Sequence, residues 1–122
     1  MARVIFDSSF LMAVAGTPTT WSEDIVDLVG KFEPVLPECV GEELQRLAGG
    51  KGGRSSTARV ALNLSAEFFR LACGGARVDD EIISAALTKG AIVATTDAEL
   101  ARAAKAAHLK VISLRRGRVW LR

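Results

Sequence analysis

The chain has 122 residues, of which 49% are apolar, and its formal net charge is +2. This length suits one compact domain that buries roughly two thirds of the surface of the unfolded chain, so we expect a single domain over residues 1–122. No apolar stretch approaches the ~20 residues of a membrane span and no signal-peptide pattern opens the chain, which predicts a soluble, cytoplasmic protein without a membrane partner.

Strands and helices alternate from the first residues onward. ARVIFD at 2–7 is a short apolar strand that leads directly into the helical pattern SSFLMAVAG. A second helix is expected in TTWSEDIVDLVGKF, with a cap at Thr20 or Ser22. EPVLP at 33–37 predicts a brief strand, and ECVGEELQRLA continues as a helix until the glycines at 49–53 stop it.

The second half of the chain repeats this alternation. STARVALNLSAEFFRLACGG predicts one long amphipathic helix that ends at the glycine pair, and DDEIISAALTKG predicts another with acids at its start. AIVATT is a strand, DAELARAAKAAH a helix and LKVISL a strand, and RRGRVWL adds an edge strand through a turn at Gly117. The pattern predicts an α/β fold with a mostly parallel central sheet and helices on both faces.

Two cysteines, Cys39 and Cys73, stand far apart in the sequence. Without a second pair they make neither a disulfide framework nor a zinc site. We therefore expect both to be reduced packing residues.

Acidic residues recur where strands end and helices begin. Asp7 ends the first strand, Asp79 and Asp80 open a later helix, and Asp97 follows AIVATT. Ligands of open parallel sheets collect outside the carboxyl ends of the strands, so these acids are candidate site residues. Each could instead be a helix cap that contributes about 1 kcal/mol.

Glu43 is a further candidate, because it lies three or four residues from Val40 and Leu47 and beside Leu44 on a helix face expected to point inward. Three or four carboxylates within about 5 Å would repel by roughly 3 kcal/mol per pair at an effective dielectric near 20. Such a group takes up protons or a divalent cation. With one histidine in the chain, Mg²⁺ or Mn²⁺ is the expected ion.

Four stretches resemble the PIN-domain nucleases, a family of small α/β metal-dependent RNases, and the similarity covers essentially the whole chain. They are VIFDSSFLM at 4–12, PECVGEEL at 37–44, VDDEIISAA at 78–86 and IVATTDAEL at 92–100, in the order and spacing of the family. The resemblance implies a three-layer PIN-like sandwich and hydrolysis of RNA phosphodiesters, by a mechanism that needs no side-chain nucleophile.

The same resemblance assigns roles to individual residues. It implies Asp7, Glu43, Asp79 and Asp97 as the catalytic acids, with Asp7, Asp79, Asp80 and Asp97 as metal ligands. Its spacing mildly favours Asp79 over Asp80, which could hold the metal instead or through water. Ser9 and Glu99 are auxiliary candidates near the metal.

Basic residues gather in two places and are candidates to hold phosphates of single-stranded RNA. They are Lys51, Arg54 and Arg59 in the glycine-rich segment, and Arg115, Arg116 and Arg118 near the end of the chain. The segment could equally be a solvated connection between helices. Trp120 could stack on a base or simply pack.

Several readings stay open from sequence. Within the family, an RNA-processing (rRNA) factor with a ribosome-assembly partner competes with a toxin paired with an antitoxin, and the motifs look more like the processing group. The family also implies a homodimer. A receiver-like phosphoacceptor domain and a noncatalytic RNA-binding module are the alternatives outside it; the first lacks a lysine after its last core strand.

Overall fold

A computed structural model describes all of residues 1–122 as one six-stranded sheet and six helices. None of the helices combines the length and apolar composition that crossing a bilayer would demand. In chain order the elements are β1 (Ala2–Phe6), α1 (Ser8–Gly16), α2 (Trp21–Val29), β2 (Phe32–Pro37), α3 (Glu38–Ala48), α4 (Gly53–Leu64), β3 (Phe69–Leu71), α5 (Val78–Lys89), β4 (Ile92–Ala94), α6 (Ala98–Ala106), β5 (Val111–Arg115) and β6 (Arg118–Leu121).

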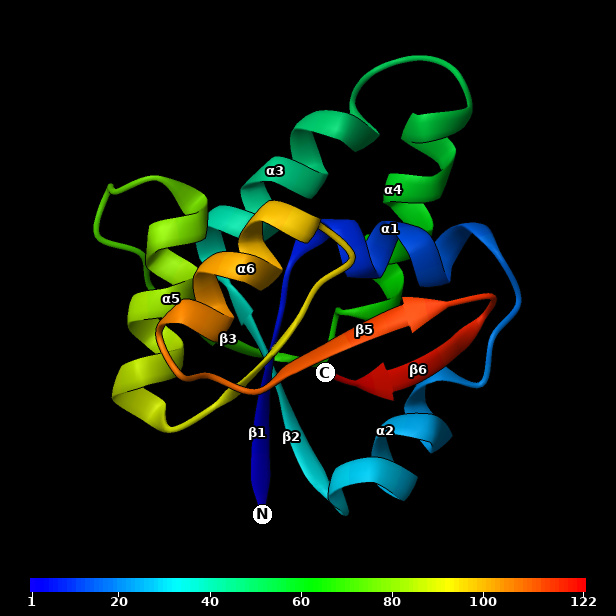
Figure 1. The fold of residues 1–122 in the computed structure, drawn as a ribbon. Helices are drawn as coiled ribbons and strands as arrows, with labels where there is room; N and C mark the ends of the chain where they lie inside the picture. The colour runs from blue at the N-terminus through cyan, green and yellow to red at the C-terminus, as the bar shows by residue number, and fades with distance from the viewer.

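The strands follow the order β3-β2-β1-β4-β5-β6, and all neighbours are parallel except β5 and β6. Helices α1 and α2 lie on one side of the sheet and α5 and α6 on the other, so the molecule has three layers (Figure 1). The predicted α/β class and three-layer sandwich are confirmed.

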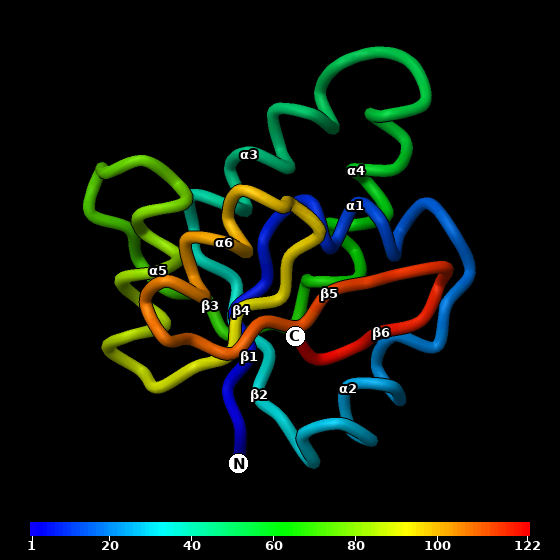
Figure 2. Tube along the Cα trace, in the orientation of Figure 1, coloured from blue at the N-terminus to red at the C-terminus, as the bar shows by residue number.

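The order in which the chain adds strands to the sheet reverses at the centre of the sheet, between the parallel strands β1 and β4. The chain moves outward from β1 to β2 and β3, then returns to β4 and moves the other way (Figure 2). Loops that leave such neighbouring strands toward opposite faces open a crevice at the carboxyl edge, where ligands of doubly wound sheets bind. Asp7 follows β1 and Asp97 follows β4 at this edge.

The core on the α1 side is built around Phe6, which is fully buried at the end of β1. Its ring centroid lies 5.5 Å from that of Phe10, 5.6 Å from Trp21 and 5.1 Å from Phe68, with tilted or edge-on rings. Aromatic pairs in such arrangements each add about 0.5–1.5 kcal/mol beyond their burial. This cluster therefore fixes the strand that carries Asp7.

The long helix predicted across residues 56–73 is wrong, because α4 ends at Leu64 and β3 follows. The buried hydroxyl of Ser65 donates to the carbonyl of Ala61, and a turn then closes from the amide of Phe68 to the carbonyl of Ser65. Phe68 turns into the aromatic cluster, while Phe69 pairs with Val35 of β2 and stays 54% exposed. Tertiary packing at the sheet edge thus overrides a local helical pattern.

The expectation of two reduced cysteines is also wrong, since Cys39 and Cys73 form a disulfide with a Cα–Cα distance of 6.0 Å. The sheet register explains the pairing. Pro37, the last residue of β2, lies opposite Leu71, the last residue of β3. Cys39 comes two residues after Pro37 and Cys73 two residues after Leu71, so the register brings the two cysteines together. The bond joins the first turn of α3 to the loop that leads into α5.

The predicted edge strand through Gly117 is confirmed as β6, which pairs antiparallel with β5. Arg116 and Gly117 both have positive φ, 52° and 77°, as the central residues of a tight hairpin with primed geometry do.

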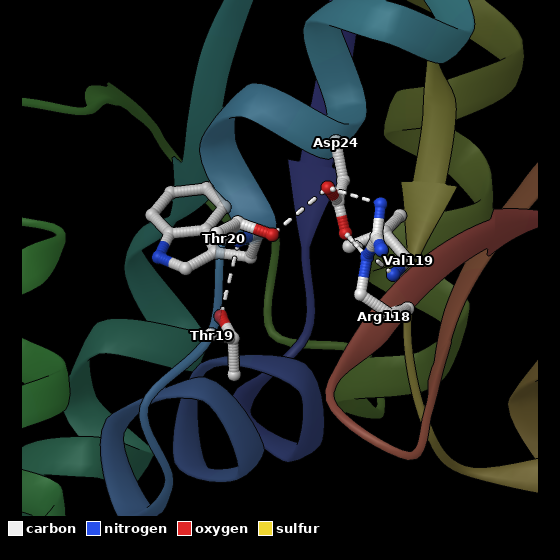
Figure 3. Close-up of polar contacts among 6 residues, drawn as sticks. Thr19, Thr20, Asp24, Arg118 and Val119 are labelled. Atoms are coloured by element: carbon white, nitrogen blue, oxygen red, sulfur yellow. Dashed lines mark hydrogen bonds and ion pairs between the residues drawn. The ribbon is translucent and has the colours of Figure 1, made fainter.

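Asp24 of α2 fastens this hairpin to the rest of the molecule (Figure 3). Its carboxylate accepts from the guanidinium of Arg118 at 3.0 and 3.2 Å, from the amide of Val119 at 3.1 Å and from the Thr20 hydroxyl at 3.0 Å. The Arg118 and Val119 donors lower the pKa of the Asp24 carboxyl to about 2. Sequence reading gave Asp24 no role beyond an acid in the first turn of its helix.

Candidate active site at the carboxyl ends of β1 and β4

Asp7 is the buried centre of the candidate site, with only 5% of its surface exposed. Its amide donates to the carbonyl of Ala94 on the neighbouring strand at 3.0 Å. Asp7 occupies the N-cap position of α1, yet its side chain makes no capping hydrogen bond. The carboxylate is instead directed at other partners, which argues against the simple cap that the sequence left open for Asp7.

Two hydroxyls hold the Asp7 side chain. Ser9 Oγ donates to Asp7 Oδ2 at 2.6 Å and Thr95 Oγ1 donates to the same oxygen at 2.9 Å. These hydroxyl oxygens in turn accept from backbone amides, Ser9 from Thr96 at 3.1 Å and Thr95 from Asp97 at 3.0 Å. The hydroxyl protons are thereby aimed at Asp7, and Asp7 Oδ1 is left without a hydrogen bond.

Asp97 resembles Asp7 in that only one of its two carboxylate oxygens accepts hydrogen bonds from the protein. Its Oδ1 accepts from the amides of Glu99 at 2.8 Å and Leu100 at 3.4 Å, which caps α6. Its Oδ2 takes no hydrogen bond. The cap that the sequence suggested is therefore present, and one carboxylate oxygen of this exposed residue remains available for a ligand.

Asp79, in the first turn of α5, faces these acids. Partial burial and then the negative charges of Asp7, Asp97 and Glu99 raise the pKa of its carboxyl, against the opposing effect of Arg77. Three segments that are distant in the sequence thus bring four carboxylates into electrostatic contact. Repulsion of this sort is relieved by a proton or a cation.

The other acids near α5 have different surroundings. Asp80 is exposed to solvent, whereas Asp79 is half-buried. Glu81 turns away toward the preceding loop, where its carboxylate accepts from the amide of Gly74. The structure therefore brings Asp79 of the predicted pair toward Asp7 and Asp97, and the assignment of metal ligands stays a prediction.

Glu43 lies on the other flank of Asp7. It is half-buried on α3, beside the buried Leu44, and it lines a hollow of about 440 Å³ together with Ser8, Ser9 and Arg54. Ser9 connects the two parts of the site, because its side chain bonds Asp7 and also lines this hollow.

The acids are more loosely gathered than a group within about 5 Å, since no three His, Cys, Asp or Glu side chains stand close enough to share one metal ion. The donor chemistry nevertheless fits a hard cation, because every candidate ligand is a carboxylate oxygen. Mg²⁺ keeps several waters and is usually bound through one or two carboxylates plus substrate phosphates. Asp7 and Asp97, each with one oxygen free of hydrogen bonds, meet that requirement.

The basic candidates divide into free and engaged side chains. Arg59 donates to the carbonyl of Ala48 at 3.0 Å and to the Ser56 hydroxyl at 3.2 Å, and Arg118 pairs with Asp24. Arg115 lies over the ring of Trp120 at 4.7 Å, so this indole packs within the hairpin. The remaining candidates, Lys51, Arg54 and Arg116, are exposed and make no ion pair.

Comparison with known proteins agrees with this geometry. The family model described as a PIN-like domain matches residues 4–118. The chain belongs to the PIN-domain family. This confirms the family expected from the four stretches, and a search of curated proteins gives no match.

Three solved structures share the fold over most of the chain. The structure of the PIN domain endonuclease Utp24 is 27% identical with a TM-score of 0.78, and the alignment covers 98% of this chain and 90% of that one. A domain of a functionally unknown protein from Methanocaldococcus jannaschii DSM 2661 is 17% identical with a TM-score of 0.69, covering 94% and 92%. PAE2754 from Pyrobaculum aerophilum is 18% identical with a TM-score of 0.52, covering 81% and 77%. The last two likenesses concern the fold alone.

Two residues of this PIN domain carry parts of the site that sequence reading missed. From sequence, Thr95 received no role in the site, although its hydroxyl donates to Asp7 Oδ2. Arg46, which lines the hollow beside Glu43, received no role. The signal for Arg46 was its place three residues after Glu43, which puts both on one helix face.

Proposed function

We propose that this PIN domain is an endoribonuclease that cuts RNA phosphodiester bonds with Mg²⁺ or Mn²⁺ and acts in RNA processing, with rRNA as the substrate class. The observation that supports it best is that Asp79 lies within electrostatic range of Asp7 and Asp97 at the switch point of the sheet, where a cation would relieve their mutual repulsion. A solved relative that is 27% identical is described as a PIN domain endonuclease.

The proposed cation ligands are Asp7 through Oδ1 and Asp97 through Oδ2, with Asp79 and Asp80 acting through bridging waters, because no three acidic side chains stand close enough to share one ion directly. A bound cation would offset the charge of the scissile phosphate, lower the pKa of an attacking water and stabilise the transition state. Ser9 and Thr95 fix the direction of the Asp7 carboxylate by their two hydrogen bonds. Because these partners already order Asp7, little rotamer freedom is lost when a ligand binds.

Glu43, beside Ser9 in the hollow, is proposed as a further catalytic acid, and Glu99, near Asp79, as an auxiliary acid. Lys51 and Arg54 are proposed to bind phosphates of single-stranded RNA, since neither forms an ion pair within the protein. Arg116 at the hairpin turn is a more distant candidate. Homodimer formation and cytoplasmic location remain predictions.

The proposal is tested by cleavage of a fluorescent RNA oligonucleotide with single-stranded regions in Mg²⁺, Mn²⁺ or EDTA. Cutting is expected with either ion, and EDTA or Asp7→Asn should abolish it while the circular dichroism spectrum persists. Asp27→Asn is the matched control, because Asp27 is an exposed acid of α2 that makes no hydrogen bond or ion pair. Equal cutting by wild type and Asp7→Asn would refute the assignment.

Two alternatives give different outcomes in the same experiments. A noncatalytic RNA-binding module, which the loose spacing of the acids favours, would bind the oligonucleotide without cutting it in either ion. A toxin-type PIN ribonuclease would cut RNA and would also arrest growth on expression, with rescue by a small antitoxin partner. A processing factor with a ribosome-assembly partner should cut RNA without such an arrest.

A further inference from the structure

The hollow beside Asp7 has a chemistry that differs from that of the acidic centre. It measures about 440 Å³, within the usual range for ligand sites, and lies between α1, α3 and the start of α4. The guanidinium side chains of Arg46 and Arg54 line it, together with Ser8, Glu43 and the apolar Met12 and Leu47.

Both arginines are unengaged within the protein. The chain has two ion pairs, Arg3 with Glu33 and Arg118 with Asp24, and neither involves the hollow. No side-chain hydrogen bond holds Arg46, Arg54 or the Ser8 hydroxyl, whereas the nearby Arg59 is tied to Ala48 and Ser56. Two free guanidinium groups against one carboxylate, Glu43, leave the hollow with a net positive charge.

Charge also favours one direction in which a bound RNA strand can leave the acidic centre. On the α5 and α6 flank it would meet Asp79, Asp80 and Glu99, which repel phosphates. On the α3 and α4 flank it meets the hollow, which Ser9 joins to Asp7. Beyond it, the glycine-rich loop that carries Lys51 connects α3 to α4 and projects from the body of the molecule (Figure 1).

We propose that this hollow is a nucleotide subsite for the residue next to the cleaved phosphodiester, and the inference rests on the proposed RNA-binding function. Arg46 and Arg54 bind the nonbridging oxygens of the flanking phosphate, where planar guanidinium groups can donate two parallel hydrogen bonds. Ser8 adds a neutral donor. Met12 and Leu47 form an apolar wall for the base or ribose, without the groups that would read a particular base.

Binding of a short single-stranded RNA is measured by fluorescence anisotropy in the Asp7→Asn background with EDTA, so that cleavage does not interfere. Arg46→Ala and Arg54→Ala should each weaken binding by about tenfold, and each should reduce the slope of log affinity against log salt by about 0.7. The matched control is Lys31→Ala, which removes one exposed charge just before β2. Lys31 lies at the amino ends of the parallel strands, whereas the candidate site lies at their carboxyl ends.

A series of oligonucleotides, each with one neutral methylphosphonate linkage, then locates the contact. At one linkage the loss of affinity should be large for the parent protein and nearly absent for the Arg46→Ala, Arg54→Ala double variant, because the charge that the arginines contact is already missing. Thermal melting checks that these exposed substitutions leave the fold intact.

The outcomes separate the two proposals. The subsite is overturned if the arginine variants bind RNA as tightly as Lys31→Ala does. It is also overturned if, at every linkage, the affinity lost on methylphosphonate substitution is the same in the parent and in the double variant. Either result holds even if the wild type cuts RNA. Linkage-specific coupling without cutting by the wild type supports phosphate binding in the hollow and overturns the nuclease. A parent Asp7→Asn protein that binds no RNA overturns the subsite, while cutting by the wild type in Mg²⁺ decides the nuclease separately.

Discussion

Asp97 caps a helix and is also a proposed cation ligand, and substitutions at this residue can separate the two roles. It is the N-cap of α6 through Oδ1, and in no other helix of this protein does the N-cap residue itself make a side-chain capping hydrogen bond. The proposed ligand oxygen is Oδ2. Asp97→Ala removes both functions, whereas Asp97→Asn keeps a capping oxygen and removes the charge.

The expected stability changes follow from these contacts. Loss of the two accepted bonds, at 2.8 and 3.4 Å, should cost Asp97→Ala about 1 kcal/mol of unfolding free energy. That corresponds to a melting temperature lower by roughly 4 °C for a domain of this size. Asp97→Asn loses the attraction between its charge and the helix dipole, about 0.3–1 kcal/mol, but it also relieves repulsion with Asp79. Its net change should therefore stay within about 0.5 kcal/mol.

Urea denaturation in EDTA measures the stability of both variants, and cleavage of the fluorescent RNA in Mg²⁺ measures their activity. Both should lose activity by about a hundredfold or more, as expected when a charge that stabilises the transition state is removed. Wild-type activity in Asp97→Asn would mean that Asp97 is a helix cap only. Undiminished stability in Asp97→Ala would contradict the capping geometry.

Three further changes test other parts of the molecule. Because burial and neighbouring acids raise the pKa of Asp79, the folded state binds its proton more tightly than the unfolded state, and stability should fall as pH rises from the ordinary value of 3.8 through the raised one. Asp79→Asn should therefore be more stable than wild type above that window in EDTA and equal to it below pH 3.8 in pH-dependent urea melts. For Asp24 the pH dependence of stability has the opposite sign, because its pKa is lowered to about 2 and the stability it contributes is present above pH 3.8 and lost toward pH 2. Asp24→Asn should therefore lower the melting temperature at pH 7, and the difference from wild type should disappear near pH 2. Cys39→Ser opens a disulfide across 34 residues, which should cost up to about 4 kcal/mol by loop entropy, and a reductant should destabilise the wild type equally while leaving the variant unchanged.

Sequence predicted the central part of the fold because strand and helix signals there agree with the final packing. The strands before Asp7 and Thr95 are short apolar runs, and both become buried neighbours in the sheet. The pattern failed at Phe68 and Phe69, where the apolar spacing fits a helix equally well. Only contact with Phe6 and pairing with β2 decide for a turn and a strand, and neither partner is visible locally.

The disulfide shows the same limit at longer range. Cys39 and Cys73 are unremarkable at a separation of 34 residues until the register of β2 against β3 is known. Without β3, which the predicted long helix left out, that register could not be derived from the sequence.

The candidate site was predictable in its charges and not in its hydrogen bonds. Asp7 and Asp97 stand at strand ends, a position fixed by topology, so their meeting followed from an α/β fold with the right strand order. Which oxygen of each is engaged depends on the rotamers of Ser9 and Thr95. Likewise, a basic residue such as Arg59 has the same appearance in sequence whether it is free or bound to a helix end.

These hydrogen bonds orient the acidic side chains independently of any ligand. In Asp7 and Asp97 one carboxylate oxygen is used by the protein and the other is free of hydrogen bonds, so each side chain is oriented before any ligand arrives. The unfavourable electrostatics fall mainly on Asp79, whose pKa is raised by partial burial and then by its acidic neighbours. A cation that relieved this repulsion would bind more tightly as pH rises through the Asp79 titration, because a proton and a cation compete for the same carboxylate. Proton release on addition of Mn²⁺, measured in weakly buffered solution, should therefore be seen with wild type and be reduced in Asp79→Asn. Equal release by the two proteins would place the ion elsewhere.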